Sequence, residues 1–435
     1  MTIYAEGFKT DPYWWEAAPP DTIGDTPPPD KVDIAIVGSG YTGLSAALEL
    51  ARAGVNVLVL EAHRFGEGAS TRSGGMVSSG VNVGKGGDVE KLYGKERIDH
   101  MLEEASSAYE HLEQVIEKES IDCFYRRVGR FVGAHCSSAL RSQASKIDQL
   151  NAQTGCGAAL VQKDGVRDHV ATDFYYGGMT IELSGGLHPS LYHKGLREAC
   201  RAAGVKMSAN TMVEKVEPMS EGGVRLTTSR GIVEAREAVL GTNGYTGGAT
   251  PWHQRRVVPV ASYIIATEPL GKERVKELFP TDRMISDTKR VLYYYRPSPD
   301  GTRVIFGGRA SFRSLSAAET APILYQHMLG VFPQLEGVKI THGWTGNVAF
   351  TFDRVPHIGE ENGVHYALGC NGSGVVMMSH LGHQIGLKIL GKTNRASAYD
   401  NLPLETRPLY FGTPWFLPAI GTYYKMRDWI DRRIG

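Results

Sequence analysis

The sequence has no excess of charge of either sign and no long apolar run. Lysine and arginine together number 47, and aspartate and glutamate together also number 47, so the formal net charge is zero. A neutral chain gives no electrostatic reason to expect nucleic acid as a partner. No apolar run approaches the roughly 18 residues that a membrane helix needs, so no transmembrane segment is expected.

Cysteine is scarce, and the cysteines form no pattern. The five are odd in number, widely spaced and without a CxxC pair: Cys123, Cys136, Cys156, Cys200 and Cys370. This argues against a disulfide framework and favours a reducing compartment, so we expect a cytoplasmic protein. The N-terminus lacks the basic and apolar regions of a secretory signal. The fourteen histidines show no HExxH spacing, and no metal site is expected.

Glycine, in contrast, is abundant, with 52 among the 435 residues. A chain of this length is long enough for two lobes with a large core. Glycine is needed where the backbone adopts a positive φ or approaches a ligand closely. A glycine-rich nucleotide site is therefore the first feature to look for.

A complete β-α-β unit lies near the N-terminus. Residues 33–37 form a short apolar run that is typical of a buried strand. Residues 42–53 have small and apolar side chains at helical spacing, and Gly54 ends this helix. Residues 55–60 predict a second buried strand. The order of these elements predicts an α/β nucleotide-binding domain.

The turn between the first strand and the helix carries a GxGxxG motif made by Gly38, Gly40 and Gly43. The first glycine permits a tight turn, the second lets the backbone approach a pyrophosphate, and the third lets helix and strand pack closely. Tyr41 and Thr42 lie at the helix N-terminus, whose free N–H groups attract phosphate. The motif predicts a dinucleotide cofactor.

Glu61 follows the second strand and can accept hydrogen bonds from ribose hydroxyls, whereas its carboxylate would repel the 2′-phosphate of NADP. The polar, glycine-rich loop 64–75 suits a longer cofactor, with Ser70 and backbone N–H groups on pyrophosphate and ribitol. Its alternative is a flexible surface loop. A second glycine-rich turn, 369–374, precedes an apolar helix, and its N–H groups could meet negative charge on a flavin. These features favour FAD over NAD.

The rest of the chain predicts a second lobe, based on a sheet, beside the α/β nucleotide-binding domain. Residues 96–150 are largely helical, and residues 257–310 are rich in strands. We assign 1–31 to an irregular N-terminal arm pinned by Tyr13, Trp14 and Trp15. The ranges 32–95, 155–250 and 340–395 are assigned to the cofactor domain, 96–154 and 251–339 to the substrate domain, and 396–435 to a C-terminal tail.

At these residues the chain resembles the D-amino-acid-oxidase-like FAD-dependent oxidoreductases, and in particular their γ-glutamylputrescine oxidoreductase branch. The matching stretches are 33–61, 66–75, 186–189, 241–245, 266–270, 306–309 and 356–374. The resemblance implies a discontinuous, Rossmann-like FAD domain and an inserted α+β substrate domain on a curved antiparallel sheet.

The resemblance also implies the chemistry and the cofactor contacts. A hydride would pass from a C–N carbon to flavin N5, giving an imine that is hydrolysed to an aldehyde, with oxygen or a quinone as final acceptor. Val213 would meet the adenine through its backbone. The full set of implied contacts is Gly38, Gly40, Tyr41, Thr42, Gly43, Glu61, Ala62, Arg64, Gly68, Ala69, Ser70, Arg72, Ser73, Gly74, Gly75, Val213, Thr242, Asn243, Gly244, Gly372, Ser373, Gly374 and Val375.

The chain departs from the sarcosine oxidases of the wider family at three positions. Their arginine and lysine, which hold the substrate carboxylate, fall near Gly75 and on Val376, and their flavin-linking cysteine falls near Gly346. Neither Gly75 nor Val376 can pair with a carboxylate. We therefore expect noncovalent FAD and an amine whose carboxylate, if it has one, is bound elsewhere.

Three residues are candidates for the substrate side of the flavin: Tyr294, Arg309 and Trp344. Alternation along a strand places Tyr293 and Tyr295 on one face and Tyr294 on the other. Tyr294 or Trp344 could wall an amine pocket, and each could equally serve the core. Arg309, like Arg72, could bear charge near the flavin or belong to a structural ion pair.

The tail is aromatic and basic, which fits docking on the protein body, a dimer interface or a membrane surface that supplies quinone. The sequence also leaves three alternatives for the function. The leading one is oxidation of a small-molecule amine. The others are oxidation of a D-amino acid, sarcosine or pipecolate, and a flavin-holding subunit without turnover. The sequence does not determine the oligomeric state.

Overall fold

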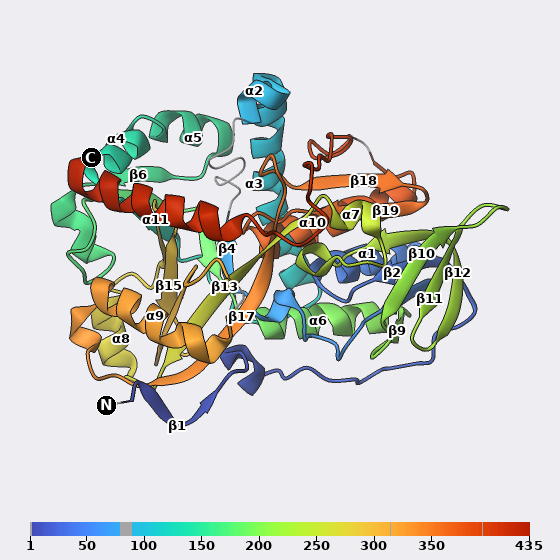
Figure 1. Ribbon diagram of the computed structural model, residues 1–435, viewed down its shortest axis with the longest axis horizontal. Coiled ribbons are helices and arrows are strands. Elements are labelled where there is room, and N and C mark those ends of the chain that lie inside the picture. The colour runs from blue at the N-terminus through green and yellow to red at the C-terminus, as the bar shows by residue number, and fades with distance from the viewer. Residues whose placement is uncertain (1, 79–88, 314, 394) are drawn as a thin grey trace.

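The computed structural model describes residues 2–78, 89–313, 315–393 and 395–435. These residues form two lobes that lie side by side, each built on one large sheet (Figure 1). The eight-stranded sheet with the β-α-β unit lies on the right of the view, and the nine-stranded sheet lies on the left. Both the α/β class and the two-lobe organisation predicted from the sequence are confirmed.

The eight-stranded sheet has a parallel centre. Its order is β10 (Val213–Pro218), β11 (Val224–Thr228), β12 (Gly231–Leu240), β2 (Lys31–Val37), β3 (Val57–Leu60) and β9 (Lys206–Ser208). β19 (Val364–Leu368) also pairs with β12, and β18 (His357–Glu361) pairs with β19. The strands from β12 to β9 run parallel. β3 is buried throughout because helices cover the sheet, which explains why its sequence is continuously apolar.

Helices α1 (Tyr41–Arg52), α6 (Pro189–Ala202), α10 (Gly374–Ile389) and α3 (Lys95–Lys118) cover this sheet. α1 packs against both α6 and α10. α10 comes so close to α1 that a Cβ on Gly382 would lie 2.3 Å from the carbonyl oxygen of Thr42. Glycine at this position therefore allows the two helices, which begin at the two predicted glycine-rich turns, to pack side by side.

The nine-stranded sheet is mostly antiparallel. Its order is β1 (Tyr4–Lys9), β17 (Ile340–Phe350), β13 (Val258–Thr267), β16 (Val304–Gly308), β15 (Tyr293–Pro297), β14 (Met284–Asp287), β5 (Arg130–Gly133), β7 (Gly178–Ile181) and β6 (Ala158–Val161). The pairs β1–β17 and β14–β5 are parallel. Helix α9 (Ala317–Val331) packs on β13 and β17 and begins with a capping box between Ser316 and Glu319.

The remaining helices and strands lie between these elements or follow them in the chain. They are η1 (Tyr13–Glu16), η2 (Ala69–Thr71), β4 (Met76–Ser78), α2 (Val89–Tyr93), α4 (Ser137–Ala144), α5 (Ile147–Thr154), η3 (Lys163–Asp168), β8 (Ser184–Gly186), η4 (Asn243–Tyr245), α7 (Pro251–Gln254), α8 (Lys272–Leu278), η5 (Pro333–Leu335) and α11 (Leu417–Ile434). β4 and β8 form a two-stranded ribbon. No helix in the described ranges is long and apolar enough to cross a membrane.

The pairing of strands revises the domain boundaries. β6 and β7, which we had assigned to the cofactor domain, belong to the nine-stranded sheet, and so does β17. Helix α3, which we had assigned to the substrate domain, packs instead in the core of the cofactor lobe against α10. We therefore propose that α3 belongs to the cofactor domain and that 158–181 and 340–350 belong to the substrate domain. Local pattern could not show this, because sheet membership depends on distant partners.

The N-terminal arm is less irregular than its composition predicts. Residues Tyr4–Lys9 form an edge strand along β17. Trp14 and Trp15 are buried, so the prediction that these aromatic residues pin the arm is confirmed. Figure 1 shows the remaining arm crossing from one lobe to the other along the lower edge of the molecule.

Candidate cofactor and substrate site

The GxGxxG turn joins β2 to α1 as the motif predicts. Gly38 has a φ of +99°, and a Cβ on Gly43 would lie 2.0 Å from the carbonyl oxygen of Gly38. Gly40 is the N-cap of α1 and offers no side chain to its N–H groups. Of these, the N–H of Tyr41 donates to Ser70 Oγ at 3.1 Å. The turn therefore presents a helix N-terminus that is suited to a pyrophosphate.

Glu61 stands at the end of β3 beside this turn. Its Oε2 accepts from the backbone N–H of Ser39 at 3.0 Å and from Ser39 Oγ at 2.6 Å, while Oε1 accepts from the N–H of His63 at 3.2 Å. These bonds fix the carboxylate next to the phosphate turn. Arg64, in contrast, is exposed and pairs with Glu67 at 3.0 Å, so its side chain is engaged away from the turn.

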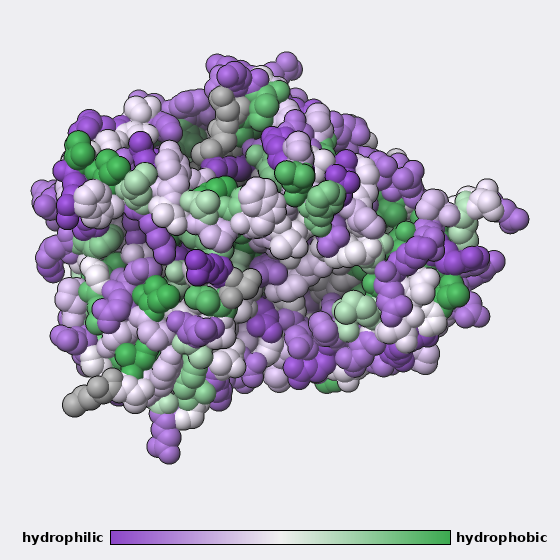
Figure 2. Space-filling view, viewed as in Figure 1, coloured by the Kyte–Doolittle hydropathy of each residue, from purple (hydrophilic) through white to green (hydrophobic). Residues whose placement is uncertain are grey.

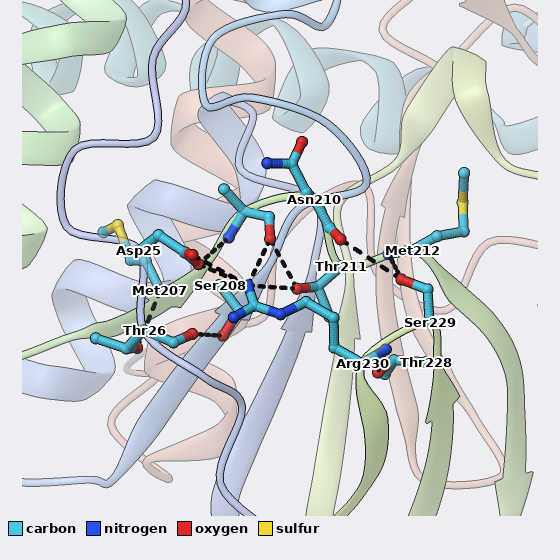
Figure 3. Close-up of polar contacts among 11 residues, drawn as sticks. Asp25, Thr26, Met207, Ser208, Asn210, Thr211, Met212, Thr228, Ser229 and Arg230 are labelled. Carbon is cyan, nitrogen blue, oxygen red and sulfur yellow. Dashed lines mark hydrogen bonds and ion pairs between the residues drawn. The ribbon is translucent and has the colours of Figure 1, made fainter.

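A polar network supports the neighbouring loop 209–212, which leads into Val213 (Figure 3). The N–H of Thr211 donates to the carbonyl oxygen of Glu61 at 2.7 Å, so Val213 begins β10 close to the carboxylate. Arg230 Nη1 donates to Asp25 Oδ1 and to the carbonyl oxygen of Ala209, both at 2.9 Å. The arm thus braces the place where an adenine is expected.

Tryptophans hold the loop 66–75 at the junction of the lobes. Trp14 donates its indole N–H to the carbonyl oxygen of Ser73, and Trp344 donates to that of Arg72, both at 2.8 Å. Trp15 donates to Thr71 Oγ1 at 3.0 Å. The loop is therefore anchored, and the alternative of a flexible surface loop does not hold. These contacts favour Trp344 as a positioning residue, because it is buried and its N–H is occupied.

The Arg72 side chain is also engaged in structural contacts. Its Nε donates to the carbonyl oxygen of Glu67 at 2.8 Å and its Nη1 to that of Thr345 at 3.2 Å, and its guanidinium lies over the Trp15 ring. Within the described ranges it forms no ion pair, and these contacts are to backbone carbonyls and an aromatic ring. Gly346 lies against the Arg72 side chain, with a would-be Cβ 3.1 Å from it.

The second glycine-rich turn lies beside the first. Gly241 follows β12, and a Cβ on it would be 3.1 Å from the N atom of Gly43. Next to it, Asn243 Oδ1 accepts from the N–H of Gly369 at 3.0 Å, which ties Thr242–Gly244 to the turn 369–374. Gly372 has a φ of +97°, and α10 begins without a side-chain cap on Ser373. The N-terminus of α10 at Gly374 and Val375 thus lies close to the first turn.

Tyr294 lies where the two lobes meet. Its ring is 3.1 Å from a would-be Cβ on Gly74 of the loop and 2.3 Å from one on Gly307 of β16, and its hydroxyl bonds Ser262 Oγ at 2.8 Å. Burial raises the pKa of Tyr294 to about 12, so the phenol is neutral at physiological pH. Tyr293 and Tyr295 both pack on Phe306, so the predicted alternation of the three tyrosines is confirmed.

Arg309 follows β16 at the same junction. No hydrogen bond or ion pair joins its guanidinium to another residue within the described ranges, and it lies over the Phe350 ring at 4.7 Å. The titratable groups that act on it are Tyr424, Arg354 and Tyr294, none of them a carboxyl. Burial lowers the pKa of Arg309 to about 10, which still leaves a cation at neutral pH. Figure 2 shows the surface hollowed at the junction of the lobes.

The GxGxxG turn, the Glu61 carboxylate fixed beside it and the second lobe packed against this domain are the arrangement of a dinucleotide-dependent oxidoreductase. The chain matches the family model described as DAO, FAD dependent oxidoreductase, over residues 33–386, and it belongs to this family.

Several curated relatives match over most of the chain. γ-Glutamylputrescine oxidoreductase of Escherichia coli K12 is 31% identical over 94% of this chain and 95% of its own, and probable oxidoreductase OrdL of Haemophilus influenzae is 32% identical over 87% of each. Glycine oxidase from Geobacillus kaustophilus has a similar fold, with a TM-score of 0.73 and 19% identity over 87% of this chain and 99% of its own.

The described residues fit FAD. The close approach of Gly43 to Gly38, the N-termini of α1 and α10 without side-chain caps and the fixed Glu61 carboxylate all lie around the carboxyl ends of β2, β3 and β12. Sequence reasoning missed several supports of this site. Ser39 holds Glu61, and His193 Nε2 bonds the carbonyl oxygen of Ser39 at 2.8 Å. The position of Ser39 within the GxGxxG was the one available signal, whereas nothing local pointed to His193.

Proposed function

We propose that this protein oxidises a primary amine whose other end carries a carboxylate, as in γ-glutamylputrescine. The amine carbon would lose a hydride to FAD and the nitrogen a proton, and water would convert the imine to an aldehyde and ammonia. Similarity to a γ-glutamylputrescine oxidoreductase over nearly the whole chain supports an amine as the substrate. Noncovalent attachment of FAD is part of the proposal.

The observation that carries the substrate assignment is the Arg309 guanidinium. Arg309 is half-buried, and a cation partly withdrawn from water without an anionic partner favours a ligand that supplies the anion. Arg309 meets no carboxylate in the described part of the chain, and Arg354 adds a second positive charge nearby. We propose that a substrate carboxylate binds there and that Tyr294, held by Ser262, forms one wall of the amine pocket.

The first test is anaerobic reduction of the bound flavin. We expect γ-glutamylputrescine to bleach the flavin absorbance, while D-alanine, sarcosine and pipecolate leave it unchanged. Bleaching by one of these amino acids instead would replace the proposal with an amino-acid oxidase. If no compound in the set bleaches the flavin, and the protein purifies with a second chain, a flavin-holding subunit is supported. Acid precipitation that leaves yellow colour in the pellet would contradict noncovalent FAD.

A substitution tests the anion site separately. We expect Arg309→Gln to raise KM for γ-glutamylputrescine about tenfold or more, because a charge-assisted hydrogen bond contributes roughly 1.5–3 kcal/mol. The value of kcat/KM for putrescine, which has no carboxylate, should change little. Arg313→Gln is the matched control, since Arg313 is exposed on the same segment. Equal losses for both substrates would show that Arg309 does not bind the carboxylate.

A further inference from the structure

Helix α11 presents two different faces. Its inner face docks on the second lobe, with Gly421 and Asp428 buried. Asp428 accepts from the backbone N–H groups of Val291 at 2.9 Å and of Arg290 at 3.0 Å. Because Asp428 satisfies backbone donors next to β15, the helix is held in one orientation. The docking of Asp428 on the second lobe therefore fixes which face of α11 is exposed to solvent.

The outer face carries large apolar side chains. Tyr423, Met426 and Trp429 are each just over half exposed and follow one another at helical spacing, and Ile434 at the end of the helix is 82% exposed. The segment leading into the helix exposes Leu409, Phe411 and Trp415 as well. Figure 1 shows α11 crossing the front of the second lobe, and Figure 2 shows apolar and hydrophilic side chains mixed over this part of the surface.

The exposed charges of this segment are basic. Residues 409–435 contain Lys425, Arg427, Arg432 and Arg433, and the side-chain carboxylates of Asp428 and Asp431, both of which pair with Arg290 on the body. Arg427 also pairs with Asp431, and Arg432 donates to the carbonyl oxygen of Phe174, so Lys425 and Arg433 are the basic residues of this segment that are exposed to solvent. The guanidinium of Arg433 lies over the Trp429 ring at 4.0 Å, so cation and aromatic ring share one surface. Aromatic rings interleaved with lysine and arginine suit the interface of an anionic bilayer.

We propose that the outer face of α11 is a membrane-docking surface for anionic lipid. A second copy of the chain is a poorer occupant, because a twofold contact through this face would place its basic residues against their own copies. Anionic headgroups complement the cations, while Trp429, Met426 and Tyr423 enter the boundary with the acyl chains. Tyr424 on the same helix bonds Arg354 at 2.8 Å, so the docked face lies directly behind the proposed substrate site.

The experiment is sedimentation of the FAD-loaded full chain with vesicles. We expect binding to vesicles of phosphatidylglycerol mixed with phosphatidylcholine, weakening with salt, and little binding to phosphatidylcholine alone. Trp429→Ser with Met426→Ser, and separately Lys425→Glu with Arg433→Glu, should each weaken binding about tenfold or more. Ile232→Ser is the matched control, because Ile232 is a similarly exposed apolar residue on the cofactor sheet.

Two results would overturn the proposal. One is wild-type protein that stays in the supernatant with anionic vesicles at low salt. The other is a dimer in light scattering that the Trp429→Ser, Met426→Ser variant converts to monomer without any vesicle binding by the wild type. The flavin content and melting temperature of each variant, measured alongside, distinguish a lost surface from a lost fold.

Discussion

Glycine 43 is the residue whose identity the cofactor turn restricts most tightly. A methyl group there would lie 2.0 Å from the carbonyl oxygen of Gly38, so α1 would have to move away from β2. We expect Gly43→Ala to lower stability by about 1–3 kcal/mol and to reduce FAD occupancy strongly. Thermal unfolding and the ratio of flavin to protein absorbance measure both effects.

The control for this substitution is Gly330→Ala. Gly330 lies inside α9, where an added Cβ meets nothing within 4 Å, so the helix should tolerate or favour alanine. A Gly43→Ala protein that retains full FAD and an unchanged melting temperature would contradict the tight packing of α1 on β2.

Single residues were also the level at which sequence reasoning did best. Gly38, Gly40, Gly43 and Glu61 could be placed because their motif has fixed local geometry. Trp344 could not be assigned to pocket or core in advance, because the answer depended on a hydrogen bond to Arg72, 272 residues earlier in the chain.

At the level of elements, the docking of α11 depends on one buried carboxylate. Asp428→Asn removes the charge that accepts the N–H groups of Arg290 and Val291 and places an amide donor against them. We expect the helix to detach locally, with a loss of about 3 kcal/mol in its docking. Hydrogen exchange across residues 417–434 should accelerate, and Asp122→Asn at an exposed site should leave it unchanged. Unchanged protection in Asp428→Asn would show that the apolar contacts of α11 suffice.

Most elements could be predicted from the sequence, and their partners could not. The strands β2 and β3 begin and end close to the predicted residues because burial gives each a clear local pattern. β1 was missed, since a short edge strand has little burial to shape its sequence. The hydrogen bond between Arg354 and Tyr424 of α11 could not be predicted either, because it joins the tail to a turn before β18 that lies 70 residues away in the chain.

At the level of the whole molecule, acid should destabilise the fold above the usual carboxyl range. Burial lowers the pKa of eight histidines: His111, His135, His169, His188, His193, His253, His327 and His342. The folded state therefore binds fewer protons than the unfolded state below about pH 6.5. The contribution of these histidines to the free energy of unfolding is fully present above that pH and is lost as the pH falls towards 4.

His193 makes this prediction specific, because its pKa is lowered to about 4 and it bonds the carbonyl oxygen of Ser39 beside Glu61. The lowered pKa of His193 alone accounts for about 3 kcal/mol of the free energy of unfolding that is lost at low pH. We expect denaturant unfolding to show a falling free energy between pH 6.5 and 4 and FAD release in the same range. His193→Gln should flatten this dependence, whereas His63→Gln at an exposed site should not. A pH-independent wild type over this range would refute the argument.

The parallel pairing of β1 with β17 bears on how the chain is made. Tyr4 pairs with Ile340, so the first strand to be synthesised must wait for a partner from the last quarter of the chain. At the usual rate of translation this wait is roughly 20 to 70 s. During that time the segment Tyr4–Lys9 lacks its partner strand, whereas the arm behind it can already meet Phe65 and Met207, which it bridges through Asp21 and Asp25. Closure of the nine-stranded sheet is thus a late event. A nascent chain that stalls before residue 340 has β13 paired with β16 alone, and the edge of β13 that β17 would cover is exposed to chaperones and proteases.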